Sequence, residues 1–146
     1  MSITIWFVRL VLLFQGLMAA VQPVLAGSFM SGNYDALTVH SGVGGSMFLV
    51  TALALLAVVA HGAAGSRLWP VGLHVLLLVA VIMQIAVGST RNLALHIPLG
   101  VALVAVMVWL AIWAWLPGAR LRRTYLVRRR KAPAVPPVPT SQGVAQ

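Results

Sequence analysis

The sequence predicts an all-α protein, a bundle of four transmembrane helices followed by a disordered tail that is first basic and then proline-rich. Three observations predict this fold: 61% of the residues are apolar, only 8% are charged, and the apolar residues fall into four long runs. Residues 1–118 contain as formal charges only Arg9, Asp35, Arg67 and Arg91. A water-soluble domain of this length needs far more charge on its surface. We therefore expect this domain to lie in a lipid bilayer.

The four apolar runs cover residues 4–25, 36–60, 68–88 and 93–116. Each can cross a hydrocarbon core of about 30 Å, because a helix rises about 1.5 Å per residue and about 20 residues suffice. Strands are not expected, since polar and apolar residues do not alternate and lipid requires backbone hydrogen bonds within each segment. Short polar breaks separate the runs, so an up-down-up-down bundle is the simplest arrangement.

Positive charge is concentrated after the last run. Seven of the ten Lys and Arg residues lie between Arg120 and Lys131, in the tail of residues 119–146. The positive-inside rule places this tail in the cytoplasm, and four spans place the N-terminus there too. We expect the basic segment to contact anionic lipid headgroups of the plasma membrane and not nucleic acid. The proline-rich end has no helical or strand pattern and is expected to be disordered.

The first run has two interpretations. Arg9 lies before an apolar stretch that ends in Val-Leu-Ala at 24–26, ahead of Gly27, and this pattern resembles a cleavable signal peptide, whose removal would leave three helices. Retention is favoured, because the run is longer than a usual signal core and carries Gln15 and Gln22, which suit contacts between helices. In a retained helix, Arg9 is expected to extend its side chain to the cytoplasmic surface.

The histidines are the candidates for chemistry, because polar residues within a membrane are costly. His40 follows Asp35 by five residues and His96 follows Arg91 by five, so both rings are expected about 7.5 Å below the outer-side charges. The second and fourth runs cross the membrane in the same direction. One histidine from each can therefore face the other across the bundle.

Glycine follows each of these histidines by four residues, at Gly44 and Gly100. One interpretation is a b-type haem with His40 and His96 as axial ligands and with the glycines leaving room at its faces. The other is close helix packing, with the histidines hydrogen-bonded across the interface. The second interpretation describes a non-catalytic membrane subunit or assembly partner, in contact with another membrane protein or with a second copy of this chain.

His61 and His74 form a weaker second candidate pair near the opposite surface. His61 follows His40 by 21 residues, which is about 31 Å along a helix. A solvated or interfacial position explains His61 without a cofactor. The chain has no cysteine and one acidic residue, so thiolate metal sites and paired-carboxylate catalysis are excluded. Whether the chain is an enzyme stays open.

A weak internal repeat relates the two halves of the chain. Each half contains a glutamine, a glycine turn and a histidine, with Gln22 before His40 and Gln84 before His96. Such halves are expected to be related by a pseudo-twofold axis along the membrane normal. Each glutamine amide has three candidate partners, which are a haem propionate, a quinone carbonyl and a neighbouring helix.

Residues 22–27, 35–44 and 91–100 carry a resemblance to a family of small four-helix membrane proteins of high-GC Gram-positive bacteria. More distantly, the chain resembles one four-helix half of a haem A synthase, in which histidines of the second and fourth helices ligate a haem. This resemblance implies axial ligation by His40 and His96. The synthases combine two such halves and have an acidic residue near the first histidine, whereas Asp35 lies about 140° around the helix from His40. The resemblance thus implies electron transfer or haem carriage more than haem modification.

Overall fold

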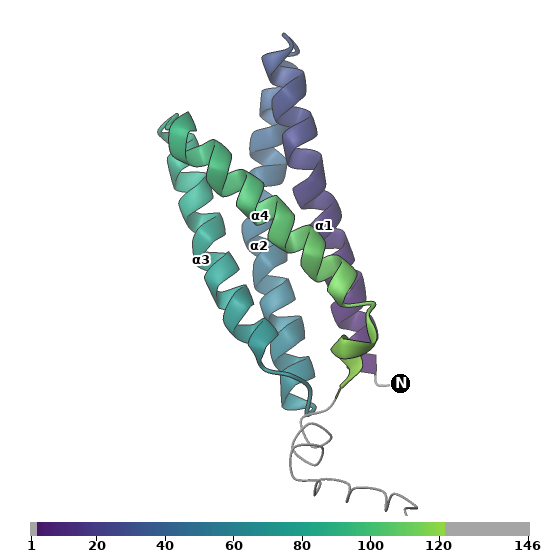
Figure 1. The fold of residues 1–146 in the computed structure, drawn as a ribbon. Helices are drawn as coiled ribbons and strands as arrows, with labels where there is room; N and C mark the ends of the chain where they lie inside the picture. The colour runs from purple at the N-terminus through teal and green to yellow at the C-terminus, as the bar shows by residue number, and fades with distance from the viewer. Residues whose placement is uncertain (1–2, 122–146) are drawn as a thin grey trace, which may run out of the picture.

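The computed structural model describes residues 3–121, which form four long helices and one short 3-10 helix (Figure 1). The elements are α1 (Ile3–Met30), α2 (Asp35–Ala63), α3 (Trp69–Ser89), α4 (Leu93–Trp113) and η1 (Pro117–Arg120). Each α-helix is long and apolar enough to cross a membrane. The predicted all-α fold is confirmed, and the chain is a multi-pass membrane protein. The prediction of a disordered tail falls on residues 122–146, which lie outside the described part.

The four helices pack in a closed ring. Helix α1 contacts α2 and α4, and α3 contacts the same two helices. The α1–α2 and α3–α4 loops lie at one end of the bundle, and the start of α1, the α2–α3 loop and η1 lie at the other (Figure 1). We call the first the histidine-pair end, because His40 and His96 are near it, and the second the Arg9 end, after Arg9.

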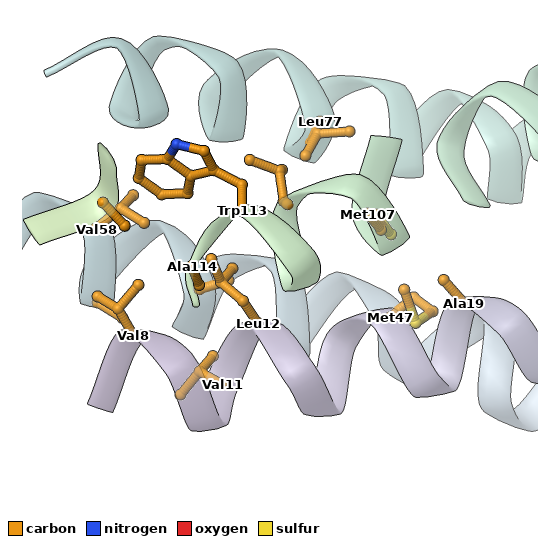
Figure 2. Packing of buried hydrophobic residues seen from close by; sticks show 14 of the residues in the cluster. Val8, Val11, Leu12, Ala19, Met47, Val58, Leu77, Met107, Trp113 and Ala114 are labelled. Atoms are coloured by element: carbon orange, nitrogen blue, oxygen red, sulfur yellow. The ribbon is translucent and has the colours of Figure 1, made fainter. Parts of the chain in front are cut away.

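The core is one apolar cluster to which all four helices contribute (Figure 2). Leu12 of α1, Val58 of α2, Leu77 of α3 and Met107 of α4 are all buried in it. Many large apolar side chains on the outer surfaces of the helices are exposed instead. Such exposure is typical of helices whose outer faces contact lipid chains, since lipid does not penalise apolar surface.

Three helix ends differ from the prediction by three residues or more. Helix α2 continues beyond residue 60 to Ala63. Helix α1 continues beyond residue 25 to Met30, and the chain turns at Gly32, whose φ of 99° favours glycine. Helix α4 ends at Trp113 and not at residue 116, because Pro117 disfavours helical geometry in the residue before it. That residue, Leu116, is extended, with φ −73° and ψ 153°.

Two buried contacts fix α1 against its neighbours. Gln15 Nε2 donates a hydrogen bond to Thr51 Oγ1 of α2 at 3.1 Å, and both side chains are fully buried. On the other side, a Cβ at Gly16 would lie 2.9 Å from the Cβ of Ala111 in α4. Glycine therefore allows α1 and α4 to approach more closely than any other residue would permit.

Candidate functional site: a histidine pair at one end of the bundle

His40 of α2 and His96 of α4 lie side by side near the histidine-pair end. Their ring centres are 6.1 Å apart, and the ring planes make an angle of 65°. Both side chains are partly exposed, and both lie near the first residues of their helices. The predicted meeting of these two rings is confirmed, and their ligation of a haem stays a prediction.

Each imidazole is held by a backbone carbonyl of the helix that precedes its own. His40 Nδ1 lies 3.2 Å from the carbonyl oxygen of Gln22 in α1, and His96 Nδ1 lies 3.1 Å from that of Gln84 in α3. A carbonyl oxygen only accepts hydrogen bonds, so Nδ1 is the donor in both rings. In the neutral rings the lone pair is therefore on Nε2.

The glutamine side chains lie beside the two glycines singled out in the sequence. The Gln22 amide lies 3.8 and 3.9 Å from the place of a Cβ on Gly44, and Gln84 Nε2 lies 2.8 Å from the place of one on Gly100. At Gly100 the missing side chain leaves room for Gln84, whereas a Cβ on Gly44 would make only ordinary contact with Gln22. That these glycines leave room for a haem stays a prediction. Both hairpins repeat the same glutamine, histidine and glycine contacts, which agrees with the internal repeat.

The two halves of the site differ at the second ring nitrogen. Gln84 Nε2 lies 3.3 Å from His96 Nε2 and 3.0 Å from the His96 carbonyl oxygen. In the part of the chain that the structure describes, Gln22 Nε2 is in contrast buried without a hydrogen-bond partner, and so is Gln84 Oε1. The site therefore contains one unpaired amide donor and one unpaired amide acceptor.

Gly88 of α3 completes the His96 half, although the sequence analysis interpreted it only as the glycine turn of the repeat. A Cβ on Gly88 would lie 2.8 Å from Cε1 and 2.9 Å from Nδ1 of the His96 ring. Glycine is therefore needed at position 88 for the ring to keep its place. The available signal was its spacing, because Gly88 follows Gln84 by four residues and so lies on the same helix face.

His61 links three elements at the Arg9 end. Its Nδ1 lies 3.0 Å from Thr4 Oγ1. Its Nε2 lies 2.9 Å from Ser66 Oγ and 3.3 Å from the Ala119 carbonyl oxygen. The side chain is only 8% exposed. A solvated position for His61 is therefore wrong, because α1 and η1 cover the side chain, whereas an interfacial position stays a prediction.

His74 of α3 is fully buried and has different partners from His61. Its Nδ1 donates to the Pro70 carbonyl oxygen at 2.8 Å, whereas its Nε2 has no hydrogen-bond partner among the described residues. No hydrogen bond or ring contact joins His61 and His74 in the described part of the chain. Within residues 3–121, no group of three or more His, Cys, Asp or Glu side chains could hold a metal ion.

The fold and the site define a four-helix membrane protein in which each hairpin presents one glutamine-held histidine to the other. In comparisons with known proteins, no protein-family model, no curated protein and no solved structure matches this chain. The functional assignment therefore rests on the geometry of the histidine pair.

Proposed function

We propose that the chain binds one haem b through His40 and His96 as axial ligands, and that this haem serves electron transfer or haem handling. The observation that carries the proposal is the 6.1 Å separation of the ring centres. Two imidazoles on opposite sides of one metal have ring centres about 6 Å apart, because each metal–nitrogen bond is about 2 Å long and each nitrogen lies about 1 Å from its ring centre. A bound haem would supply the redox chemistry, and the protein would supply ligands and environment.

The hydrogen bonds on Nδ1 support this proposal. Metal-ligating histidines almost always donate the other ring N–H to a carboxylate, a backbone carbonyl or water, which fixes the tautomer and raises the basicity of the ligand. His40 and His96 both donate to a backbone carbonyl, those of Gln22 and Gln84. Nε2 is then the atom that each ring would offer to iron.

Gln84 is the group that a haem would displace. Its amide lies 3.3 Å from His96 Nε2, the atom required for ligation. The same amide donor lies 3.0 Å from the His96 carbonyl oxygen, so it keeps a hydrogen bond when it leaves the ring. Gln22 Nε2 does not hydrogen-bond to His40 Nε2 in the way that Gln84 Nε2 lies against His96 Nε2. It has no hydrogen-bond partner within residues 3–121.

The charge distribution supports a haem near the outer face of the plasma membrane. Arg9, Arg67 and Arg120 belong to the Arg9 end, and the remaining basic residues of the tail follow Arg120 in the sequence. Under the positive-inside rule this end and both termini face the cytoplasm. The histidine-pair end then faces outward, where an electron partner or a haem source on that side can reach it.

A membrane subunit whose histidines serve helix packing is the second candidate. It is favoured by the Gln84 amide at His96 Nε2 and by the two carbonyl bonds, because these satisfy polar groups without a cofactor. Such a subunit would act through a partner membrane protein or a second copy of the chain. The two candidates differ in one observable, which is haem in the purified protein.

Absorbance spectroscopy tests the proposal. The protein is expressed with haem available, purified in mild detergent and measured as a reduced-minus-oxidised difference spectrum. Wild type and His61→Ala are expected to show the same sharp haem bands, since His61 lies at the other end, whereas His40→Ala and His96→Ala should each lose them. A colourless but folded wild-type protein would refute haem binding and support the subunit, whose partner would then be sought among co-purifying proteins.

A further inference from the structure

Arg9 of α1 is enclosed where α1 meets the end of α4. Its side chain is 1% exposed, and its Nε donates to the Ala114 carbonyl oxygen at 3.0 Å. The guanidinium carbon lies 5.0 Å from the ring centre of Trp6 and 4.8 Å from that of Trp115. The expected extension of Arg9 to the surface was therefore wrong, because the carbonyl end of α4 and two aromatic rings hold it in place.

This enclosure leaves Arg9 without a neutralising charge. Its Nη2 is buried and has no hydrogen-bond partner among residues 3–121. The only acidic residue of the chain, Asp35, begins α2 at the opposite end of the bundle. Within residues 3–121, the other charged residues of the Arg9 end are cations, since Arg120 lies in η1, just after the end of α4, and Arg67 lies in the α2–α3 loop. Arg67 Nε is also buried without a partner among these residues. Buried charges are normally paired, so this end of the bundle attracts an anion.

We propose that the Arg9 end binds the phosphate group of an anionic phospholipid, with Arg9 and Arg120 as its donors. Guanidinium groups suit this ligand, because their planar N–H forks match phosphate oxygens. Trp6 and Trp115 flank the headgroup, and each is 44% exposed. Both ring centres lie 5.0 Å or less from the guanidinium carbon, so a phosphate would have to move one ring aside to reach Arg9 Nη2. The site is separate from the histidine pair.

The position of Arg9 along its helix favours a lipid over free phosphate. Arg9 lies about 9 Å along α1 from Ile3, which places it near the level of lipid headgroups in a membrane-crossing helix. Tryptophan is enriched at this level, as Trp6 and Trp115 illustrate. An anionic phospholipid that binds here can neutralise the cations with its phosphate group, while its acyl chains stay in the bilayer and contact the apolar outer surface of α1.

Thermal unfolding of the full chain in detergent tests the site. Phosphatidylglycerol, phosphatidylcholine and inorganic phosphate are added separately, and the unfolding midpoint is measured for each. Phosphatidylglycerol is expected to raise the unfolding midpoint of the wild type, because a ligand that binds the folded state stabilises it. Phosphatidylcholine and inorganic phosphate are expected to leave the midpoint unchanged. Arg120→Gln and Arg9→Lys should need about tenfold more phosphatidylglycerol for the same shift, since each weakens charge-assisted hydrogen bonds.

Arg91→Gln is the matched control, because it removes one positive charge from the other end of the bundle. It should respond to phosphatidylglycerol as the wild type does. Equal responses in wild type, Arg120→Gln and Arg9→Lys would overturn the proposal, because the basic tail would then account for all binding. Equal stabilisation by inorganic phosphate would overturn the lipid as the source of the anion. Arg120 is exposed, so its variant decides the outcome even if Arg9→Lys fails to fold.

Discussion

Gly88→Ala is expected to weaken haem binding, because it displaces the His96 ring without changing His96 itself. The new Cβ would lie 2.8 Å from ring atom Cε1, and ordinary contact begins at 3.4 Å, so the ring must move by 0.6 Å (3.4 − 2.8) to restore ordinary contact. The ring cannot move freely, since its Nδ1 is bonded to the Gln84 carbonyl at 3.1 Å. Overpacking of this kind costs about 1–3 kcal/mol. That cost corresponds to a haem dissociation constant raised about 5- to 140-fold.

Titration of the detergent-solubilised protein with haem, followed by absorbance, measures this constant. Gly72→Ala is the matched control, because it lies on the same helix and its new Cβ would meet nothing within 4 Å. Circular dichroism checks that both variants keep their helices. If Gly88→Ala binds haem as tightly as wild type and Gly72→Ala, the position of the His96 ring does not control ligation and the reasoning is refuted.

Three further predictions follow from the same contacts. Gln84→Ala is expected to tighten haem binding about two- to tenfold, because the amide no longer competes for the ring nitrogen; Gln22→Ala should leave the constant unchanged in the same titration, and equal effects would contradict this role. Gly16→Ala brings a Cβ to 2.9 Å from a side chain of α4, so its free energy of unfolding should fall by about 1–3 kcal/mol relative to Gly45→Ala, where nothing lies within 4 Å. Equal unfolding curves for these two variants would argue against close α1–α4 packing. His74→Phe removes one ring nitrogen that donates to the Pro70 carbonyl oxygen and one that has no partner within residues 3–121. Because His74 lies near the Arg9 end, away from the histidine pair, the haem-to-protein ratio should not change, and a lower ratio would reveal a second haem site.

The helices could be predicted from the sequence because the bilayer imposes both their length and their composition. Their ends were less predictable, since a glycine costs only about 1 kcal/mol within a helix and so does not by itself end one. Helix α1 thus passes through Gly27 and ends near Gly32, where a positive φ is required. Which of the two glycines turns the chain depends on the packing of α1 and α2, and composition does not reveal it.

The meeting of His40 and His96 was also predictable, because equal distances from the loop charges place two residues of parallel helices at one depth. The groups that hold the rings could not be predicted, since backbone carbonyls are present at every residue and carry no sequence signal. The buried position of Arg9 was missed for a related reason. Its partner is the carbonyl of Ala114, which is 105 residues away in sequence and becomes available only where α4 ends.

Low-temperature electron paramagnetic resonance of the oxidised, haem-loaded protein tests ligation by His40 and His96 most directly, because this signal reports the axial ligands of the iron. Bis-histidine ligation predicts a single low-spin signal in the wild type. The signal should become high-spin or disappear in both His40→Ala and His96→Ala. A low-spin signal that survives either substitution, or a folded protein that takes up no haem, would contradict the proposed function.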